Sequence, residues 1–357
     1  MTSFPELDAT PVLVVDTDVL QRNLTRMAES AEARGLALRP HAKTHKCVEI
    51  ARRQLETGAR GLTVATVSEA EVFADAGVDD LFVAYPLWVD AARGARIRAL
   101  AGRVRLTVGV ESAAGARALA AHAGTGTRVL VEIDSGHHRT GVPPERAGDV
   151  AVAARDEGLD VAGIFTFPGH SYGPGVRPRV AAEESAALTA AAASLRAAGI
   201  EPVVISGGSS PTAMIETPTE ATELRPGVYV FGDAQQLELE AITEQDIALS
   251  ALATVVSARD DVLVLDAGSK ILGADRAPWA SGYGRILGTP DARIVALSEH
   301  HATVQWPDGS PRPALGERVR VAPNHACNAV NLVDELVAVS GDAVVGTWVV
   351  AARGCNT

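Results

Sequence analysis

Residues 128–166 read RVLVEIDSGHHRTGVPPERAGDVAVAARDEGLDVAGIFT, two short apolar runs separated by a polar loop and an Ala-rich segment. Each apolar run predicts a buried strand, and the segment between them is long enough for a helix. A strand, a helix and a second strand in this order are typical of parallel strands joined by a crossover connection. The stretch is therefore one predicted βαβ unit.

The same alternation extends in both directions from this unit. Helical segments such as CVEIARRQLETG at 47–58 and VAAEESAALTAAAASLRAAG at 180–199 separate eight short apolar runs. The runs are residues 36–39, 61–66, 81–85, 105–109, 128–134, 161–166, 202–206 and 223–230. Eight strand-helix units over about 200 residues fit a closed barrel better than a doubly wound sheet, and no GxGxxG follows the first strand. The predicted fold class is α/β, with an N-terminal (β/α)8 barrel of the TIM type.

The pattern changes after about residue 236, where helical periodicity fades. Short β-rich runs separated by Asp, Gly and Pro turns follow: ALSALATVVS, DVLVLDAGS, RIVALS, HATVQW, ERVRVAP, ELVAVS and VVGTWVVAAR. Such runs predict an all-β domain. We therefore expect a barrel over residues 21–235 and a C-terminal β domain over residues 236–357.

The composition excludes several classes of protein. The 357 residues are 47% hydrophobic and carry a formal charge of -12, with no basic tail that would neutralise a nucleic acid. The first residues, MTSFPELDATPVLVVD, lack a basic region followed by an apolar run, and no segment is apolar enough to span a membrane. Three cysteines make a disulfide framework improbable. We expect a cytoplasmic protein that binds neither nucleic acid nor membrane.

The loop after the first predicted strand, RPHAKTHK, contains Lys43. Of the 32 Lys and Arg residues only Lys43, Lys46 and Lys270 are lysines, so chemistry that needs a primary amine has three candidates. The loop also contains Arg39, His41, His45 and Lys46. A lysine crowded by cations loses its proton more readily, as a Schiff-base amine requires. The alternative is a solvated basic turn.

The loops after strands seven and eight are SGGSSPT at 206–212 and RPGVY at 225–229. Phosphate groups in barrels are commonly bound by these two loops, and small residues with hydroxyl groups allow close approach to a phosphate. By itself a Gly/Ser stretch is more often an ordinary turn. Together with Lys43 at the same end of the barrel, it predicts a phosphorylated aldehyde cofactor, pyridoxal phosphate.

Two further loops contain polar side chains at this end of the barrel. In VEIDSGHHRTGV, Arg139 could contact the phenolic oxygen of the cofactor, or it could instead pair with Asp134 in a surface loop. In FPGHSY, Tyr172 or His170 could contact cofactor or substrate, and either could equally be a packed loop residue.

The C-terminal region contains the segment PNHACN at 323–328. If it is extended, His325 and Cys327 face the same side and present an imidazole and a thiol together. These ligands suit Zn2+, and two protein ligands would leave positions for water and substrate. Spacing by itself is weak evidence for a metal. His300 and His301 could add a ligand or a proton donor, although buried structural histidines are the favoured reading.

The combination of PHAKTHK, VEIDSGHHRTGV, GHSY, SGGSSPT, RPGVYVFGD, LSEHH and PNHAC resembles the D-serine dehydratase and D-threonine aldolase family over nearly the whole chain. The resemblance implies the alanine racemase-like, fold-type III architecture, in which residues 1–20 join the β domain, and a homodimer with the site near the interface. It implies that Lys43 binds the cofactor covalently and that His325 with Cys327 binds the metal. The resemblance implies seven further cofactor contacts: Arg139, Tyr172, Gly208, Ser209, Thr212, Gly227 and Tyr229. His41, in the same loop as Lys43, is a further predicted contact.

The resemblance also implies a lyase that uses pyridoxal phosphate and a divalent metal on D-3-hydroxy amino acids. Cys327 favours Zn2+ and the dehydration of D-serine or D-threo-3-hydroxyaspartate, because the aldolases of this family tend to carry His-x-Asp with Mn2+ or Mg2+. Retro-aldol cleavage to glycine and an aldehyde is the first alternative. An amino-acid racemase, which shares the fold but needs no metal, and a non-catalytic pyridoxal-phosphate carrier are further alternatives. The β domain with its His-x-Cys segment counts against the carrier.

Overall fold

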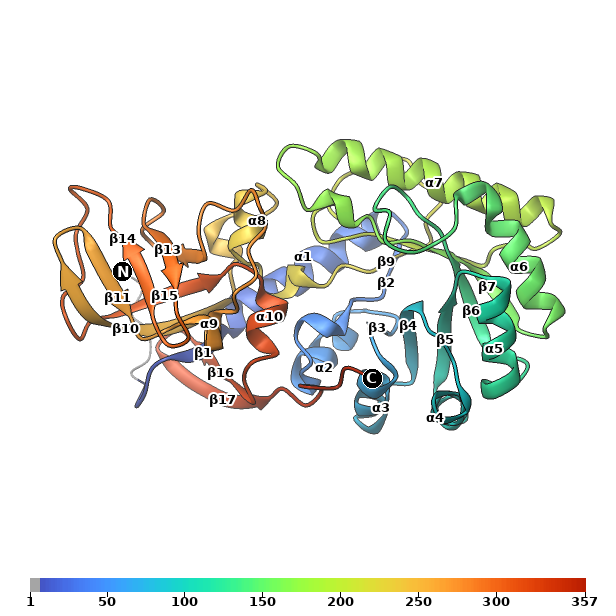
Figure 1. Ribbon diagram of the computed structural model, residues 1–357, viewed down its shortest axis with the longest axis horizontal. Coiled ribbons are helices and arrows are strands. Elements are labelled where there is room, and N and C mark those ends of the chain that lie inside the picture. Colours follow the sequence, from blue (N-terminus) through green and yellow to red (C-terminus); the bar gives the residue numbers. More distant parts are fainter. Residues whose placement is uncertain (1–6) are drawn as a thin grey trace. The chain divides into compact units, whose positions relative to one another are not determined.

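The computed structural model describes residues 7–357, which divide into two compact units. The first, here called the barrel unit, comprises residues 27–43, 54–227 and 355–357. The second, the β unit, comprises residues 7–26, 44–53 and 228–354. Figure 1 colours both by their position along the chain.

The sheet of the barrel unit has eight parallel strands, and from β3 to β9 each strand lies beside its successor in the chain. They are β2 (Ala37–Leu38), β3 (Leu62–Val64), β4 (Asp80–Pro86), β5 (Arg105–Val110), β6 (Arg128–Glu132), β7 (Asp160–Phe165), β8 (Val204–Gly207) and β9 (Glu223–Leu224). β9 pairs with β2, and an isolated parallel bridge between His41 and Thr63 joins the end of β2 to β3. The bridge closes the ring, so the predicted (β/α)8 barrel is confirmed.

Helices alternate with these strands. They are α2 (Val48–Glu56), α3 (Val67–Asp75), α4 (Ala91–Ala101), α5 (Ala113–Ala123), α6 (Ala147–Asp156) and α7 (Arg177–Ala197). Thr66, Asp90 and Ser112 begin α3, α4 and α5, and each side chain accepts a hydrogen bond from an amide of the first turn. Such capping satisfies backbone donors that have no partner inside the helix. No helix within residues 7–357 has the length and apolar character needed to cross a membrane.

The barrel interior combines aromatic packing with a buried cation. The rings of Phe82 and Phe165 meet edge to face at 5.0 Å, and the Arg225 guanidinium lies over both, 5.5 and 5.3 Å from their centroids. Gly163 allows β7 and β8 to approach closely, because a Cβ at this position would lie 1.9 Å from the Val204 carbonyl oxygen. A side chain at Gly163 would therefore open the barrel wall.

The eighth predicted strand, residues 223–230, is wrong in extent. The strand β9 ends at Leu224, and the 3-10 helix η4 occupies Val228–Val230. Pro226 lacks the N–H that a ladder requires and fixes its own φ, so the strand cannot continue through it. Tyr229 consequently lies in a helical turn, where it is buried.

The β unit contains a nine-stranded sheet and short helices. Its strands are β1 (Val12–Asp16), β10 (Leu249–Arg259), β11 (Val262–Leu265), β12 (Gly284–Ile286), β13 (Arg293–Leu297), β14 (Ala302–Gln305), β15 (Arg318–Pro323), β16 (Glu335–Ser340) and β17 (Ala343–Val349). Its helices are α8 (Ala234–Glu238), α9 (Ser269–Leu272) and α10 (Ala326–Val330), and α1 (Thr17–Ala33) begins within it. The predicted β domain is confirmed, with β12 as an unpredicted strand.

Strand β1 lies inside this sheet, between strands from the distant C-terminal half of the chain. It pairs antiparallel with β10, in the register Val14 to Ser250, and parallel with β16, in the register Val14 to Val337. The expectation that the first strand joins the β domain is therefore confirmed. The exact domain limits, 21–235 and 236–357 with 1–20, stay a prediction.

Candidate active site

Lys43 and Arg139 lie against the same aromatic ring in the barrel unit. Lys43 is in the 3-10 turn η1 (Ala42–Thr44) after β2, and its Nζ atom is 5.6 Å from the Phe167 ring centroid. The Arg139 guanidinium is 5.3 Å from the same centroid. The side chain of His41 accepts a hydrogen bond from the Lys43 amide at 3.4 Å. The loops after β2, β6 and β7 thus bring an amine and a guanidinium together.

The alternative pairing of Arg139 with Asp134 is not formed. Asp134 accepts hydrogen bonds from the amides of Gly136 and His138 at 2.9 and 3.0 Å, and from the His138 ring at 2.6 Å. This carboxylate therefore shapes its own loop, and Arg139 faces Phe167 instead.

Phe167 also organises the neighbouring aromatic residues. The Tyr172 ring lies 6.2 Å from it, centroid to centroid, and the His137 ring meets it edge to face at 5.6 Å. His170 is bonded through Nε2 to Glu183 of α7 at 3.0 Å. Tyr172 therefore joins the group around Lys43 and Arg139, and the Nε2 atom of His170 is held by a carboxylate.

The loop after β8 contains a cluster of buried hydroxyl groups. The Ser209 hydroxyl is 2.9 Å from those of both Ser171 and Thr212. Gly208 adopts a φ of 88°, a left-handed conformation that favours glycine. Three hydroxyl groups from two loops at the carboxyl end of the barrel strands form a polar lining suited to phosphate oxygens.

Glu184 of α7 lies beneath this loop. The Gly208 amide donates to its Oε1 atom at 2.5 Å, and the Thr212 hydroxyl donates to its Oε2 atom at 3.4 Å. Burial raises the pKa of Glu184 to about 7. Because the Gly208 amide is already bonded, hydroxyl groups rather than this amide are the donors left for a phosphate. Of the other predicted phosphate contacts, Gly227 belongs to the barrel unit and Tyr229 to the β unit.

The segment with His325 and Cys327 is extended only at its start. His325 precedes the short helix α10 in extended conformation, and Cys327 lies in the first turn of that helix. The two side chains still lie near one another, since the sulfur acts on the titration of the imidazole. The negative charge of the sulfur, assisted by a carboxylate, outweighs burial and raises the pKa of His325 to about 11.

That carboxylate is Asp275, whose Oδ2 atom lies 2.6 Å from His325 Nδ1. A carboxylate on one ring nitrogen fixes the orientation of the imidazole and favours the other nitrogen as a metal ligand. The Cys327 sulfur lies 3.3 Å from the Thr44 hydroxyl within the β unit. The arrangement therefore resembles the donor set of a cation site with its supporting carboxylate.

Asp233 stabilises the helix that carries Cys327. It is buried and accepts hydrogen bonds from the amides of Gln236 at 2.8 Å and Ala326 at 3.1 Å. Burial raises its pKa to about 6. Both carboxylate oxygens are thus used by backbone donors, and Asp233 is a structural residue rather than a ligand.

Within residues 7–357, no group of three or more His, Cys, Asp or Glu side chains is arranged to bind a metal. His325 and Cys327 would offer two ligands, and the remaining positions would be open to water or substrate. His300 and His301 are both exposed, so the expectation of buried structural histidines is wrong. The donor chemistry fits a soft divalent cation.

Comparison with known proteins identifies the family. The model described as alanine racemase, N-terminal domain, matches residues 15–235, and that of the putative serine dehydratase domain matches residues 248–339. The D-threo-3-hydroxyaspartate dehydratase of Delftia sp. (strain HT23) is 35% identical over 95% of this chain and 96% of its own. The chain belongs to the D-serine dehydratase and D-threonine aldolase family. Another relative, the D-threonine aldolase of Arthrobacter sp., is also 35% identical, over 97% of this chain and 93% of its own.

Solved structures of this D-serine dehydratase and D-threonine aldolase family agree. The Delftia dehydratase superposes with a TM-score of 0.88 at 34% identity, covering 96% of this chain and 97% of its own. Its structures include a histidine-to-alanine variant and, in a metal-free form, an alanine variant of the cysteine two residues further on. An alanine racemase of Clostridium difficile 630, 14% identical with a TM-score of 0.70, shares the fold.

Three residues of this family member were not anticipated from its sequence: Phe167, Glu184 and Asp275. Phe167 directly follows a predicted strand and therefore lies at the barrel mouth, so its position could have identified it as a candidate site residue. Glu184 lies in an Ala-rich helix next to Glu183. It differs from Glu183 in being buried, which the sequence does not reveal. Asp275 is 50 residues from His325, and no local pattern connects the two.

Proposed function

We propose that this protein is a lyase that uses pyridoxal phosphate and a divalent metal to dehydrate D-3-hydroxy amino acids, D-serine or D-threo-3-hydroxyaspartate. The observation that carries the proposal is the imidazole and sulfur pair of His325 and Cys327, with Asp275 on the far ring nitrogen. The named activities of the relatives support the substrate class.

The barrel unit would hold the cofactor. Pyridoxal phosphate supplies an electron sink for the charge left at Cα after proton removal. Lys43 would provide the amine that holds the cofactor and the base that accepts a proton from the substrate. Arg139, on the same Phe167 ring as Lys43, would stabilise the anionic phenolic oxygen, and the Ser209 and Thr212 hydroxyls would bind the phosphate.

The β unit would hold the metal. A divalent cation there would supply a Lewis acid for the 3-hydroxyl group of the substrate. His325 presents Nε2 because Asp275 holds Nδ1, and Cys327 presents a sulfur that favours Zn2+ over Mn2+ or Mg2+. The spacing of the two residues equals that of the histidine and the cysteine varied in the Delftia dehydratase. We therefore favour dehydration over retro-aldol cleavage. Retro-aldol cleavage is the second candidate, because some relatives are aldolases.

A substrate panel tests the proposal. The purified protein, loaded with pyridoxal phosphate, is incubated with D-serine, D-threonine and D-threo-3-hydroxyaspartate, with and without a chelator, and ammonia, keto acid and aldehyde are measured separately. We expect ammonia and keto acid in equal amounts, and their loss with the chelator. Aldehyde and glycine would replace the proposal with an aldolase. Loss of optical activity without keto acid or aldehyde would replace it with a racemase.

The finer expectations from the resemblance also remain proposals. We infer that zinc is the metal, that the protein is a homodimer with its site near the interface, and that it acts in the cytoplasm. Metal analysis of the purified protein and its mass in solution measure the first two directly.

A further inference from the structure

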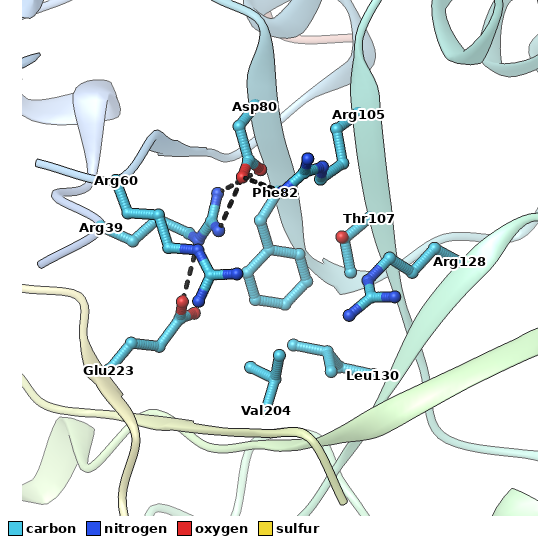
Figure 2. A pocket seen from close by; sticks show the side chains of 10 residues that line it. All are labelled: Arg39, Arg60, Asp80, Phe82, Arg105, Thr107, Arg128, Leu130, Val204 and Glu223. Carbon is cyan, nitrogen blue, oxygen red and sulfur yellow. Dashed lines mark hydrogen bonds and ion pairs between the residues drawn. The ribbon is translucent and has the colours of Figure 1, made fainter. Parts of the chain in front are cut away.

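A second polar cavity lies at the other end of the barrel from Lys43. Its volume is about 110 Å3, and its lining includes the first residues of four strands: Asp80 of β4, Arg105 of β5, Arg128 of β6 and Glu223 of β9. These residues mark the N-terminal end of the strands, whereas Lys43 follows the carboxyl end of β2. Figure 2 shows this lining, which also contains Arg39 and Arg60.

The buried charges in the lining balance one another. Arg39 donates two hydrogen bonds to Asp80, at 2.6 and 3.2 Å, and one to Glu223 at 3.1 Å. Glu223 also accepts a hydrogen bond from Ser206, which in turn accepts one from the buried Arg225. Two buried arginines, Arg39 and Arg225, thus act on these two buried carboxylates.

The arginines at the rim are not balanced in the same way. Arg128 is 3.1 Å from Asp160, and Arg105 approaches Asp80 only at 3.7 Å, although Arg39 already binds that carboxylate. Arg60 has no carboxylate partner among residues 7–357. Among the described residues, Arg128 is thus the one rim arginine paired with a carboxylate, Asp160, that no buried arginine binds, and the three rim arginines leave an excess of two positive charges.

We propose that this cavity binds a small oxyanion with two negative charges, of the size of inorganic phosphate. The excess of two positive charges at the rim matches a dianion, and guanidinium groups bind tetrahedral oxyanions and carboxylates through paired N–H donors. Phe82, Leu130 and Val204 form the apolar part of the lining, which strengthens the attraction by excluding water from one side. This proposal is independent of the reaction at Lys43.

Calorimetric titration of inorganic phosphate into the protein saturated with pyridoxal phosphate tests this site. The occupied cofactor site then cannot take up the added phosphate. We expect one equivalent to bind, and Arg60→Gln and Arg128→Gln each to weaken the affinity by about tenfold or more through loss of a charge-assisted hydrogen bond. Arg146→Gln is the matched control, since Arg146 is an exposed arginine paired with the exposed Asp149.

Parallel titrations at constant ionic strength with succinate and with chloride identify the ligand chemistry. Binding of phosphate or succinate that Arg60→Gln weakens and Arg146→Gln does not would support the site, and the tighter of the two would identify the kind of dianion. The proposal fails if phosphate and succinate give no more heat than chloride. It also fails if they bind equally well to the Arg60→Gln, Arg128→Gln and Arg146→Gln variants, because binding would then lie elsewhere.

Discussion

The Phe167 site of the barrel unit and the His325 site of the β unit differ in the charge that they present. The first places Lys43 and Arg139 on one aromatic ring, with neutral hydroxyl groups in the next loop. The second places an imidazole and a sulfur beside Asp275. The cationic first site suits an anionic cofactor, and the second site, whose donors carry negative charge, suits a metal ion. Substitutions can therefore remove cofactor binding and metal binding separately.

The largest expected effect follows from Lys43→Ala. We expect the visible absorbance of bound cofactor to disappear and turnover to fall by about a thousandfold or more, because covalent binding and proton transfer are both lost. Absorption spectra and ammonia release measure the two effects. Lys270→Ala is the control, since Lys270 is exposed and paired with Glu299. A variant at residue 43 that kept the absorbance band would refute the assignment.

Cys327→Ala separates the two sites. We expect bound metal to be lost and keto-acid formation to fall by about a hundredfold, whereas the visible absorbance persists because Lys43 is intact. Metal analysis, spectra and a keto-acid assay on the same sample check this. The control is Cys355→Ala, a substitution of the free cysteine near the C-terminus. Full metal content in the Cys327 variant would contradict the ligand assignment.

Asp275→Asn tests the carboxylate behind His325. We expect metal affinity, measured by competition with a chelator, to fall by about 10 to 100-fold, because an amide orients the imidazole less strongly. Asp308→Asn, at an exposed position of the same unit, should leave the affinity unchanged. Equal metal affinities in the Asp275 and Asp308 variants would show that Asp275 does not support metal binding.

The smallest effect concerns Glu184→Gln. The pKa of Glu184 in the folded protein, about 7, lies above its ordinary value of 4.5, so its contribution to stability is present at low pH and is lost as the pH rises through 7. Denaturant unfolding should show this loss, at most about 3 kcal/mol, in the parent protein and not in the variant. Glu183→Gln, at the partly exposed neighbouring position, should retain the dependence. Identical pH profiles for the parent and the Glu184 variant would disprove the assignment.

The sequence was sufficient to predict the barrel, since every one of its strands overlaps a predicted apolar run, although the eighth run extends beyond β9. It was not sufficient where distant residues decide local structure. Ala326 donates its amide to Asp233, 93 residues away, and this contact helps turn the predicted extended segment into the start of α10. The contact of Asp275 with His325 could not be predicted either, because hydrogen bonds between distant segments leave no periodic pattern in the sequence.

The site residues themselves divide in the same way. Lys43 and Arg139 could be selected because both follow predicted strands of one barrel, whose carboxyl ends meet at one mouth. Residue type also predicted the pairing of His325 with Cys327, although the backbone between them is helical rather than extended. By contrast, the exposure of His300 and His301 depends on the β13 and β14 turn, which the dipeptide does not reveal.

The central position of β1 in its sheet sets an order of events during synthesis. Val12 pairs with Leu252, so about 240 residues must be added after β1 before its first partner exists. At about 5 to 20 residues per second this takes on the order of 10 to 50 seconds, during which the apolar segment VLVVD has no sheet to join. The second partner, β16, arrives only near the end of the chain. The nascent chain therefore needs protection at its first strand longer than anywhere else in the β unit.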